Sequence, residues 1–118
     1  MLKGRLSLAV GALAGAPMLQ AAGDVDFATL GELSQAVSEV IGRGSEVTLL
    51  DLRKVRSIDA GAAGKLIEAC RSLGPDRKLC VIARGQSEQL LRKVRLDSMM
   101  FVVGDADAAA ELVKQTSR

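Results

Sequence analysis

The sequence predicts an α/β domain with a mostly parallel central sheet of about five strands and about four helices. The 118 residues suit one domain, and a hydrophobic share of 48% is typical of a globular protein. Strand-like and helix-like hydrophobic periods alternate along the chain. The expected order is therefore β-β-α-β-α-β-α-β-α, within one domain over residues 1–118 whose core covers about 6–113.

The beginning of the chain is expected to form a β-hairpin. Apolar residues alternate with period two from Leu6 to Val10, and a second run from Met18 to Val25 follows a turn within Gly11–Ala16. The same stretch has features of a secretory signal peptide, because basic residues precede a small, apolar segment that ends near Ala22. Glycines and Pro17 interrupt that segment, and cleavage would remove two strands that the sheet needs. We therefore expect the hairpin.

The hydrophobic period becomes helical after Phe27. Thr29 and Glu32 have the spacing of a capping box, in which each side chain satisfies a free backbone amide of the first turn. Gly42 and Gly44 are expected to end this helix. Its expected buried face consists of Leu30, Leu33, Val37, Val40 and Ile41.

The later elements alternate in the same way. Two short, nearly continuous apolar runs are typical of strands covered on both faces. Asp59 and Asp105 stand at positions that suit helix N-caps. The expected elements are a strand at 47–52, a helix from Asp59 to Gly74-Pro75, a strand at 79–83, a helix at about 87–95, a strand at 99–103 and a helix from Asp105 through Val113.

The composition excludes several kinds of site. The chain has no histidine, tryptophan or tyrosine, so imidazole catalysis and histidine-containing zinc sites are absent. The few aromatic residues and a net charge of +2 do not favour nucleic-acid binding. Cys70 and Cys80 lie in apolar segments and are expected to be buried, reduced thiols. We expect no metal, no cofactor and no nucleic-acid partner.

Catalysis by carboxylates is the enzyme hypothesis that the composition leaves. A general acid and base need two carboxylates with separated pKa values. Nothing in the spacing brings together any two of the candidates, and we expect no enzyme activity. The candidates are Asp24, Asp26, Asp51 and Asp59.

Four short segments occur in a recognisable order. They are Gly23–Thr29 (GDVDFAT), Val47–Leu52 (VTLLDL), Ser57–Asp59 (SID) before a helix start of small residues, and Arg95–Asp97 (RLD). Together they resemble the STAS domain, a family named after sulfate transporters and anti-sigma factor antagonists, over about residues 6–113. The resemblance implies a fold whose helices lie mainly on one face of the sheet. It also implies a cytoplasmic protein-interaction module without enzyme activity.

The resemblance also implies a switch that this chain lacks. In anti-sigma factor antagonists of the family, the serine after the motif aspartate is phosphorylated, and this abolishes binding to a partner kinase. Here that position is Ala60, followed by Gly61 and Ala62, so no phosphate can be added there. Ser57 offers an alternative hydroxyl, which we expect to be buried or to stabilise the loop. The small residues of Gly61–Gly64 are expected to pack closely on the sheet.

The resemblance places the partner-binding site on the loop and helix that follow the third strand. The partner is expected to be an anti-sigma factor or switch kinase. Alternatively, the chain is an accessory subunit or excised domain of a transporter, of the phospholipid ABC or sulfate type, with a transporter subunit as its partner. A weak homodimer is left open, and no direct membrane insertion is expected. The expected site residues are Arg56, Ser57, Asp59, Ala60, Gly61, Gly64, Lys65, Glu68 and Arg71.

Basic residues follow two strands of the predicted parallel sheet. Arg53, Lys54 and Arg56 come after the third strand, and Arg84 follows the fourth. The carboxyl ends of parallel strands share one edge, where α/β proteins often bind ligands. These residues form an anion-binding candidate for a nucleotide, a phospholipid headgroup or an acidic partner surface. The alternative is a solvated basic rim.

Overall fold

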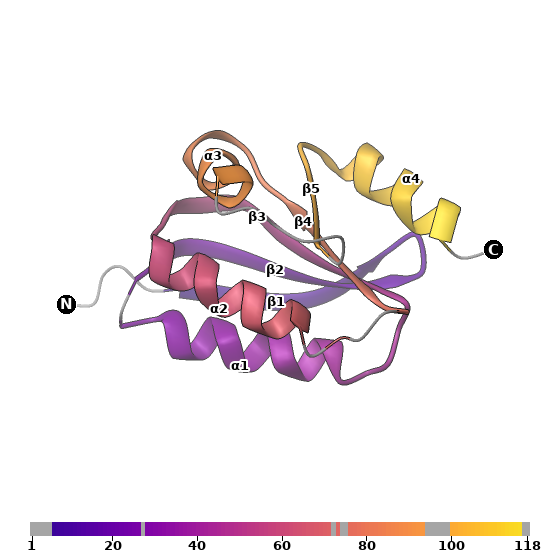
Figure 1. Ribbon diagram of the computed structural model, residues 1–118, viewed down its shortest axis with the longest axis horizontal. Helices are drawn as coiled ribbons and strands as arrows, with labels where there is room; N and C mark the ends of the chain where they lie inside the picture. The colour runs from indigo at the N-terminus through magenta and orange to yellow at the C-terminus, as the bar shows by residue number, and fades with distance from the viewer. Residues whose placement is uncertain (1–5, 27, 72, 74–75, 94–99, 117–118) are drawn as a thin grey trace.

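The computed structural model describes residues 6–116, apart from residues 27, 72, 74–75 and 94–99 and the side chain of Cys70. It confirms the α/β class and the element order. One sheet has the strand order β1-β2-β3-β4-β5, and only the β1–β2 pair is antiparallel. The elements are β1 Leu6–Leu13, β2 Ala16–Val25, α1 Leu30–Ile41, β3 Val47–Ile58, α2 Ala60–Arg71, β4 Lys78–Ile82, α3 Gly85–Lys93, β5 Met100–Val103 and α4 Ala106–Thr116 (Figure 1).

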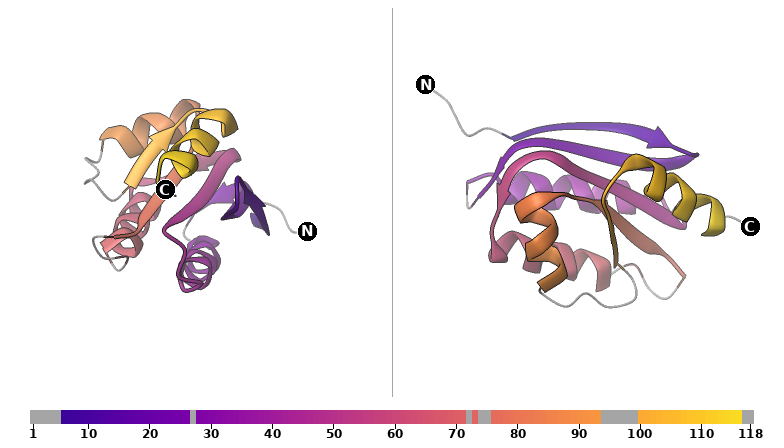
Figure 2. Two further views of the ribbon diagram at one scale, coloured as in Figure 1. Left: turned by 90° about the vertical axis from the view of Figure 1, so that its right-hand side faces the viewer. Right: turned by 90° about the horizontal axis from the view of Figure 1, so that it is seen from above.

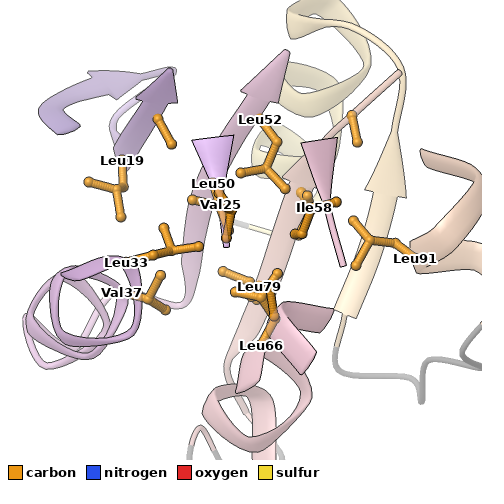
Figure 3. Packing of buried hydrophobic residues seen from close by; sticks show 14 of the residues in the cluster. Leu19, Val25, Leu33, Val37, Leu50, Leu52, Ile58, Leu66, Leu79 and Leu91 are labelled. Carbon is orange, nitrogen blue, oxygen red and sulfur yellow. The ribbon is translucent and has the colours of Figure 1, made fainter. Parts of the chain in front are cut away.

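The sheet separates two hydrophobic layers. Buried residues of α1, α2 and α3 form the larger core with one face of the sheet, as the side chains in Figure 3 show. On the other face, Ala109 and Val113 of α4 pack against Val47, Cys80 and Ile82. Figure 2 shows that α4 covers only part of this second face. At the turn end of the β1–β2 hairpin, Ala16 is buried in the same cluster, and Leu13 and Met18 pack against it. The prediction that the helices lie mainly on one face is confirmed.

The first hairpin is tighter than expected. β1 and β2 pair without a break up to Leu13 and Ala16, so the turn consists of Ala14 and Gly15 alone. Both turn residues have positive φ, 53° and 85°. This is the type I′ arrangement, whose twist matches that of the strands. Gly11, expected in the turn, instead pairs within the ladder.

The predicted capping box of α1 is wrong. The Thr29 side chain makes no cap hydrogen bond and instead donates to the carbonyl oxygen of Asp24 at 2.8 Å. Asp26 holds the entry turn, because its Oδ1 accepts from the amides of Ala28 and Thr29. The predicted apolar face is correct, with Leu30 half-buried and four other residues buried. The helix ends at Ile41, as Gly42 and Gly44 predict.

β3 is longer than its apolar run. It continues to Ile58 instead of Leu52 because it pairs with β2 beyond the end of β4. The register shifts twice along β2, once between Gln20 and Ala22 and once between Gly23 and Asp24. These bulges break the alternation of buried and exposed side chains in the second half of β3, so the sequence there predicts a loop instead of a strand. The basic residues expected after the strand lie within it.

The buried thiol of Cys80 lies between the sheet and α4. Burial raises the pKa of Cys80 to about 11, so the thiol is protonated at neutral pH. This agrees with the prediction for Cys80, whereas the Cys70 side chain lies outside the described residues. The same is true of Val94, Arg95–Asp97 and Met99, on which parts of the predicted third helix, last strand and fourth motif depend.

Candidate partner-binding site

The loop from β3 into α2 is fixed at its helical end by Asp59. Asp59 Oδ1 accepts from the amide of Ala62 at 2.9 Å, and its carbonyl oxygen accepts from Ala63 at 3.1 Å. This confirms the predicted N-cap, which satisfies amides that the first helical turn leaves free. Ala60 is exposed at the first position of the helix.

A side chain from α3 fixes the other end of this loop. β4 has already ended where β3 reaches Ile58, so no strand pairs with Ile58 on that side. Gln86 takes the place of a strand: its Nε2 donates to the Ile58 carbonyl at 2.9 Å, and its Oε1 accepts from the Ile58 amide at 3.2 Å. The sequence does not reveal this contact, because residues 28 positions apart carry no local signal of pairing.

The start of α2 combines buried alanines with exposed glycines. Ala62 and Ala63 are fully buried and let the helix lie close to the sheet, as predicted. Gly61 and Gly64 are exposed, and packing does not require them. A Cβ at Gly61 would lie 3.5 Å from Asp59 Oδ1, an ordinary contact, and one at Gly64 would have nothing within 4 Å. Close packing therefore explains only the two alanines.

All nine predicted site residues are exposed, and we call them the α2 surface. Lys65 Nζ lies 3.5 Å from Glu68 Oε1, within this surface. Lys65 also lines an open groove of about 520 Å³ with residues of α1. Figure 1 shows α1 and α2 running side by side. The α2 surface consists of Arg56, Ser57, Asp59, Ala60, Gly61, Gly64, Lys65, Glu68 and Arg71.

The expectation for Ser57 is wrong. Its side chain is neither buried nor, within the part of the chain that the structure describes, hydrogen-bonded. The loop is held by Asp59 and Gln86 instead, so Ser57 is a free hydroxyl beside the start of α2.

Arg53 of the basic rim is paired with a carboxylate. Asp51 is 6% exposed, and its two carboxylate oxygens accept from Arg53 Nε at 3.0 Å and Arg53 Nη2 at 2.8 Å. Burial raises the pKa of Asp51, but hydrogen bonds and charge attraction from Arg53 outweigh burial and hold that pKa below its ordinary value. Asp51 in turn raises the pKa of Arg53, so the pair is fully ionised at neutral pH.

Arg56 is paired as well. Its Nε and Nη2 each donate to one carboxylate oxygen of Asp24 at 3.0 Å. Hydrogen bonding and attraction to Asp24 raise the pKa of this exposed guanidinium. Asp24 lies on β2, so Arg56 reaches toward the hairpin rather than toward α2.

The two other basic residues, Arg84 and Lys54, are not paired with carboxylates within the described residues. Arg84 donates from Nε to the carbonyl oxygen of Gly104 at 2.7 Å. The Lys54 side chain has no hydrogen bond or ion pair within the described part of the chain, and Lys54 lines a depression of about 210 Å³ with Gln20 and Asp51 on the open sheet face. With Arg53 and Arg56 neutralised, the rim has less positive charge than its sequence indicates, and anion binding there stays a prediction.

Each of the four carboxylates of the enzyme hypothesis accepts hydrogen bonds from an arginine or from backbone amides. Asp24 and Asp51 pair with arginines, whereas Asp26 and Asp59 accept from backbone amides. In the described ranges, no three histidine, cysteine, aspartate or glutamate residues gather as a metal site would require. The helices that the structure describes include none long and apolar enough to cross a membrane.

Comparison with known families agrees with this geometry. Residues 8–104 match a family model described as "Mlab, STAS domain". The chain belongs to the STAS family. In this STAS chain, the matched residues include the α2 surface and its supports, Asp59 and Gln86. No curated protein matches the sequence.

Solved structures share the STAS fold of this chain. An anti-sigma factor antagonist from Mycobacterium paratuberculosis has a TM-score of 0.86 and 21% identity, covering 96% of this chain and 97% of that one. Unphosphorylated SpoIIAA, an anti-sigma factor antagonist, has a TM-score of 0.66 and 11% identity, covering 92% and 97%. An uncharacterised protein from Shewanella loihica with a SpoIIAA-like fold has a TM-score of 0.57 and 13% identity, covering 91% and 92%. At these identities the likeness establishes the fold.

Proposed function

We propose that this STAS domain is a non-enzymatic, cytoplasmic protein-interaction module that binds a regulatory partner through the α2 surface and is not switched by phosphorylation at its helix start. The partner class that suits the family is an anti-sigma factor or a switch kinase. Ala60 supports the unswitched form, because alanine can neither accept a phosphate nor supply its charge.

Gly61 and Gly64 carry this proposal. A glycine inside a helix costs roughly 1 kcal/mol of stability relative to alanine. No contact within the described residues requires a glycine at either position, since a Cβ would fit at both. An exposed glycine does let the backbone of another molecule approach the helix closely. We therefore assign the missing side chains to partner contact.

The first experiment is affinity capture from cells in which the protein is native, with mass spectrometry of what binds. Gly64→Ala should raise the free energy of unfolding by about 0.5–1 kcal/mol and still reduce partner recovery several-fold. The control is Gln89→Ala, an exposed substitution to alanine on α3 and outside the groove that Lys65 lines, which should leave recovery unchanged. Full recovery with Gly64→Ala would contradict the proposed surface.

Ala60→Asp tests the missing switch. A carboxylate at the first helical position interacts favourably with the helix dipole, so the domain should stay folded. The added charge should nevertheless lower the recovery of a partner whose binding surface contacts an uncharged residue at position 60. Unchanged recovery with a folded Ala60→Asp variant would mean that the partner does not contact this position.

A second candidate function is that of an accessory subunit in a lipid transport system. The description of the matching family favours this second function, because the description contains the name Mlab and does not mention an anti-sigma factor. The α2 surface would then bind a transporter subunit. Capture of a kinase-like anti-sigma factor supports the first function, and capture of an ABC ATPase or permease supports the second.

A further inference from the structure

The outer edge of β1 is long and uncharged. β1 is the edge strand of the sheet, and no described element pairs with its other side. The eighteen consecutive residues Leu6–Gly23, which include β1 and most of β2, contain no charged side chain. Figure 2 shows this hairpin along one side of the molecule, with α4 away from its free edge.

β1 lacks the features that usually keep edge strands apart. Such strands are commonly short, or carry charges, prolines or bulges. The opposite edge strand, β5, has four residues, and Arg92 Nη2 donates to the Val102 carbonyl at 3.1 Å. β1 has eight residues, none of them charged or proline, and its register with β2 is regular. Among the described residues, nothing pairs with its outer backbone groups, which could therefore bond to another strand.

The side chains of β1 suit a second copy of the same strand. Val10 is a large hydrophobic residue, and yet 49% of its surface is exposed to solvent. Leu6 and Leu8 pack against the core on the helix side, whereas Ser7 and Ala9 line the open face. In an antiparallel pair centred on Ala9, apolar Leu8 of one copy lies opposite Val10 of the other. The remaining opposed pairs are Ala9 with Ala9, Ser7 with Gly11 and Leu6 with Ala12.

We propose that β1 pairs in antiparallel fashion with β1 of a second copy, so that two sheets join across a two-fold axis. A neutral edge meets an identical neutral edge without charge repulsion, and the net charge of +2 adds little. An eight-residue strand offers an edge about 27 Å long. That edge is smaller than the roughly 800 Å² per partner of a standard interface, so the dimer should be reversible at micromolar or higher concentrations.

The dimer would present two partner-binding surfaces. α1, not α2, packs beneath β1, so edge pairing leaves both copies of the α2 surface open. A clustered partner could then be held at two points, with the gain in affinity that bivalent binding gives. The dimer itself does not rest on the proposed function, because it uses a different part of the molecule.

Sedimentation equilibrium of the full chain from about 1 to 300 µM tests the dimer. The wild-type protein should pass from monomer to dimer over this range. Val10→Lys should be monomeric throughout, and Ala12→Lys on the same strand serves if Val10→Lys does not fold. Ser38→Lys adds the same charge on exposed α1 and should leave the dimer intact. A wild-type monomer at every concentration, or a dimer that persists in both strand variants, would overturn the proposal.

Disulfide formation tests the register. In a Cys70→Ser background, Ala9→Cys should give a covalent dimer under mild oxidation, since directly opposed residues have Cβ atoms about 4.5–5.5 Å apart. Ser38→Cys should not. Loss of dimer formation without loss of captured partner would separate this proposal from the proposed function. Covalent dimers from Ser38→Cys but not from Ala9→Cys would contradict β1 pairing.

Discussion

Ala14 adopts a backbone conformation that residues with a Cβ rarely take. Its φ is 53°, at the first position of the two-residue hairpin turn. Asparagine tolerates this conformation and is favoured before glycine in type I′ turns. Ala14→Asn should therefore raise the free energy of unfolding by about 0.5–1 kcal/mol, measured by urea denaturation. Gly15→Ala, at φ 85°, should lower it by about 1 kcal/mol. Equal effects of the two changes would contradict the turn geometry.

The Asp51–Arg53 pair predicts a dependence of stability on pH. The folded pKa of Asp51 lies below its ordinary value, so its stabilising contribution is complete above the unfolded pKa of about 3.9 and is lost as pH falls through the folded pKa. The double variant Asp51→Asn/Arg53→Gln should lose less stability than wild type between pH 6 and pH 2.5 in urea titrations. Glu68→Gln, in an exposed pair, should behave like wild type. An unchanged slope in the double variant would contradict the assignment.

The hydrogen bonds from Gln86 of α3 should stabilise the loop that follows Ile58 of β3. Gln86→Ala removes both hydrogen bonds to Ile58, which should cost about 1–2 kcal/mol and speed hydrogen exchange at the Ile58 amide. Gln89→Ala, a neighbouring exposed residue of α3, should change neither quantity. Gln86→Glu keeps an acceptor for the Ile58 amide, but its second carboxylate oxygen would repel the Ile58 carbonyl, so this variant should not restore wild-type protection. An Ile58 amide as protected in Gln86→Ala as in wild type would show that the loop is held otherwise.

The sequence predicts most elements because each carries its own local signal. The helical period of α1 and the N-caps at Asp59 and Asp105 depend only on neighbours along the chain, and the structure confirms them. β3 is different, because its second half exists only by pairing with β2 across two bulges. The capping box at Thr29 fails for a related reason, since the Thr29 hydroxyl donates to the Asp24 carbonyl of β2 and accepts from the Asp26 amide instead of an amide of the helix. Local patterns are overruled where a neighbouring strand offers a better partner.

The charges of the α2 surface should determine how strongly the domain binds its partner. Lys65→Glu with Arg71→Glu reverses two exposed charges and should weaken partner capture at least tenfold without changing the melting temperature by more than a few degrees. Arg43→Glu with Lys114→Glu makes the same net change on other exposed parts of the molecule. Comparable capture by both double variants would show that only net charge matters, and the α2 surface would then be wrong.

The sequence proposes where the candidate site lies but does not show which contacts support it. The family resemblance indicated the loop and α2, and every residue expected there is exposed. The pairing of Arg56 with Asp24 joins residues 32 positions apart, and that of Ile58 with Gln86 joins residues 28 apart. Neither can be read from spacing. For that reason the basic rim appears more strongly charged in the sequence than in the folded molecule.

The replacement of a strand by the side chain of Gln86 has a consequence for how such a domain can diversify. A neighbouring strand can be altered only by rebuilding several residues and the backbone that carries them. A glutamine can be exchanged by one substitution on an element that need not touch the partner. The stiffness of the loop at Ile58 is therefore open to adjustment in descendants of this chain while the α2 surface keeps its own residues.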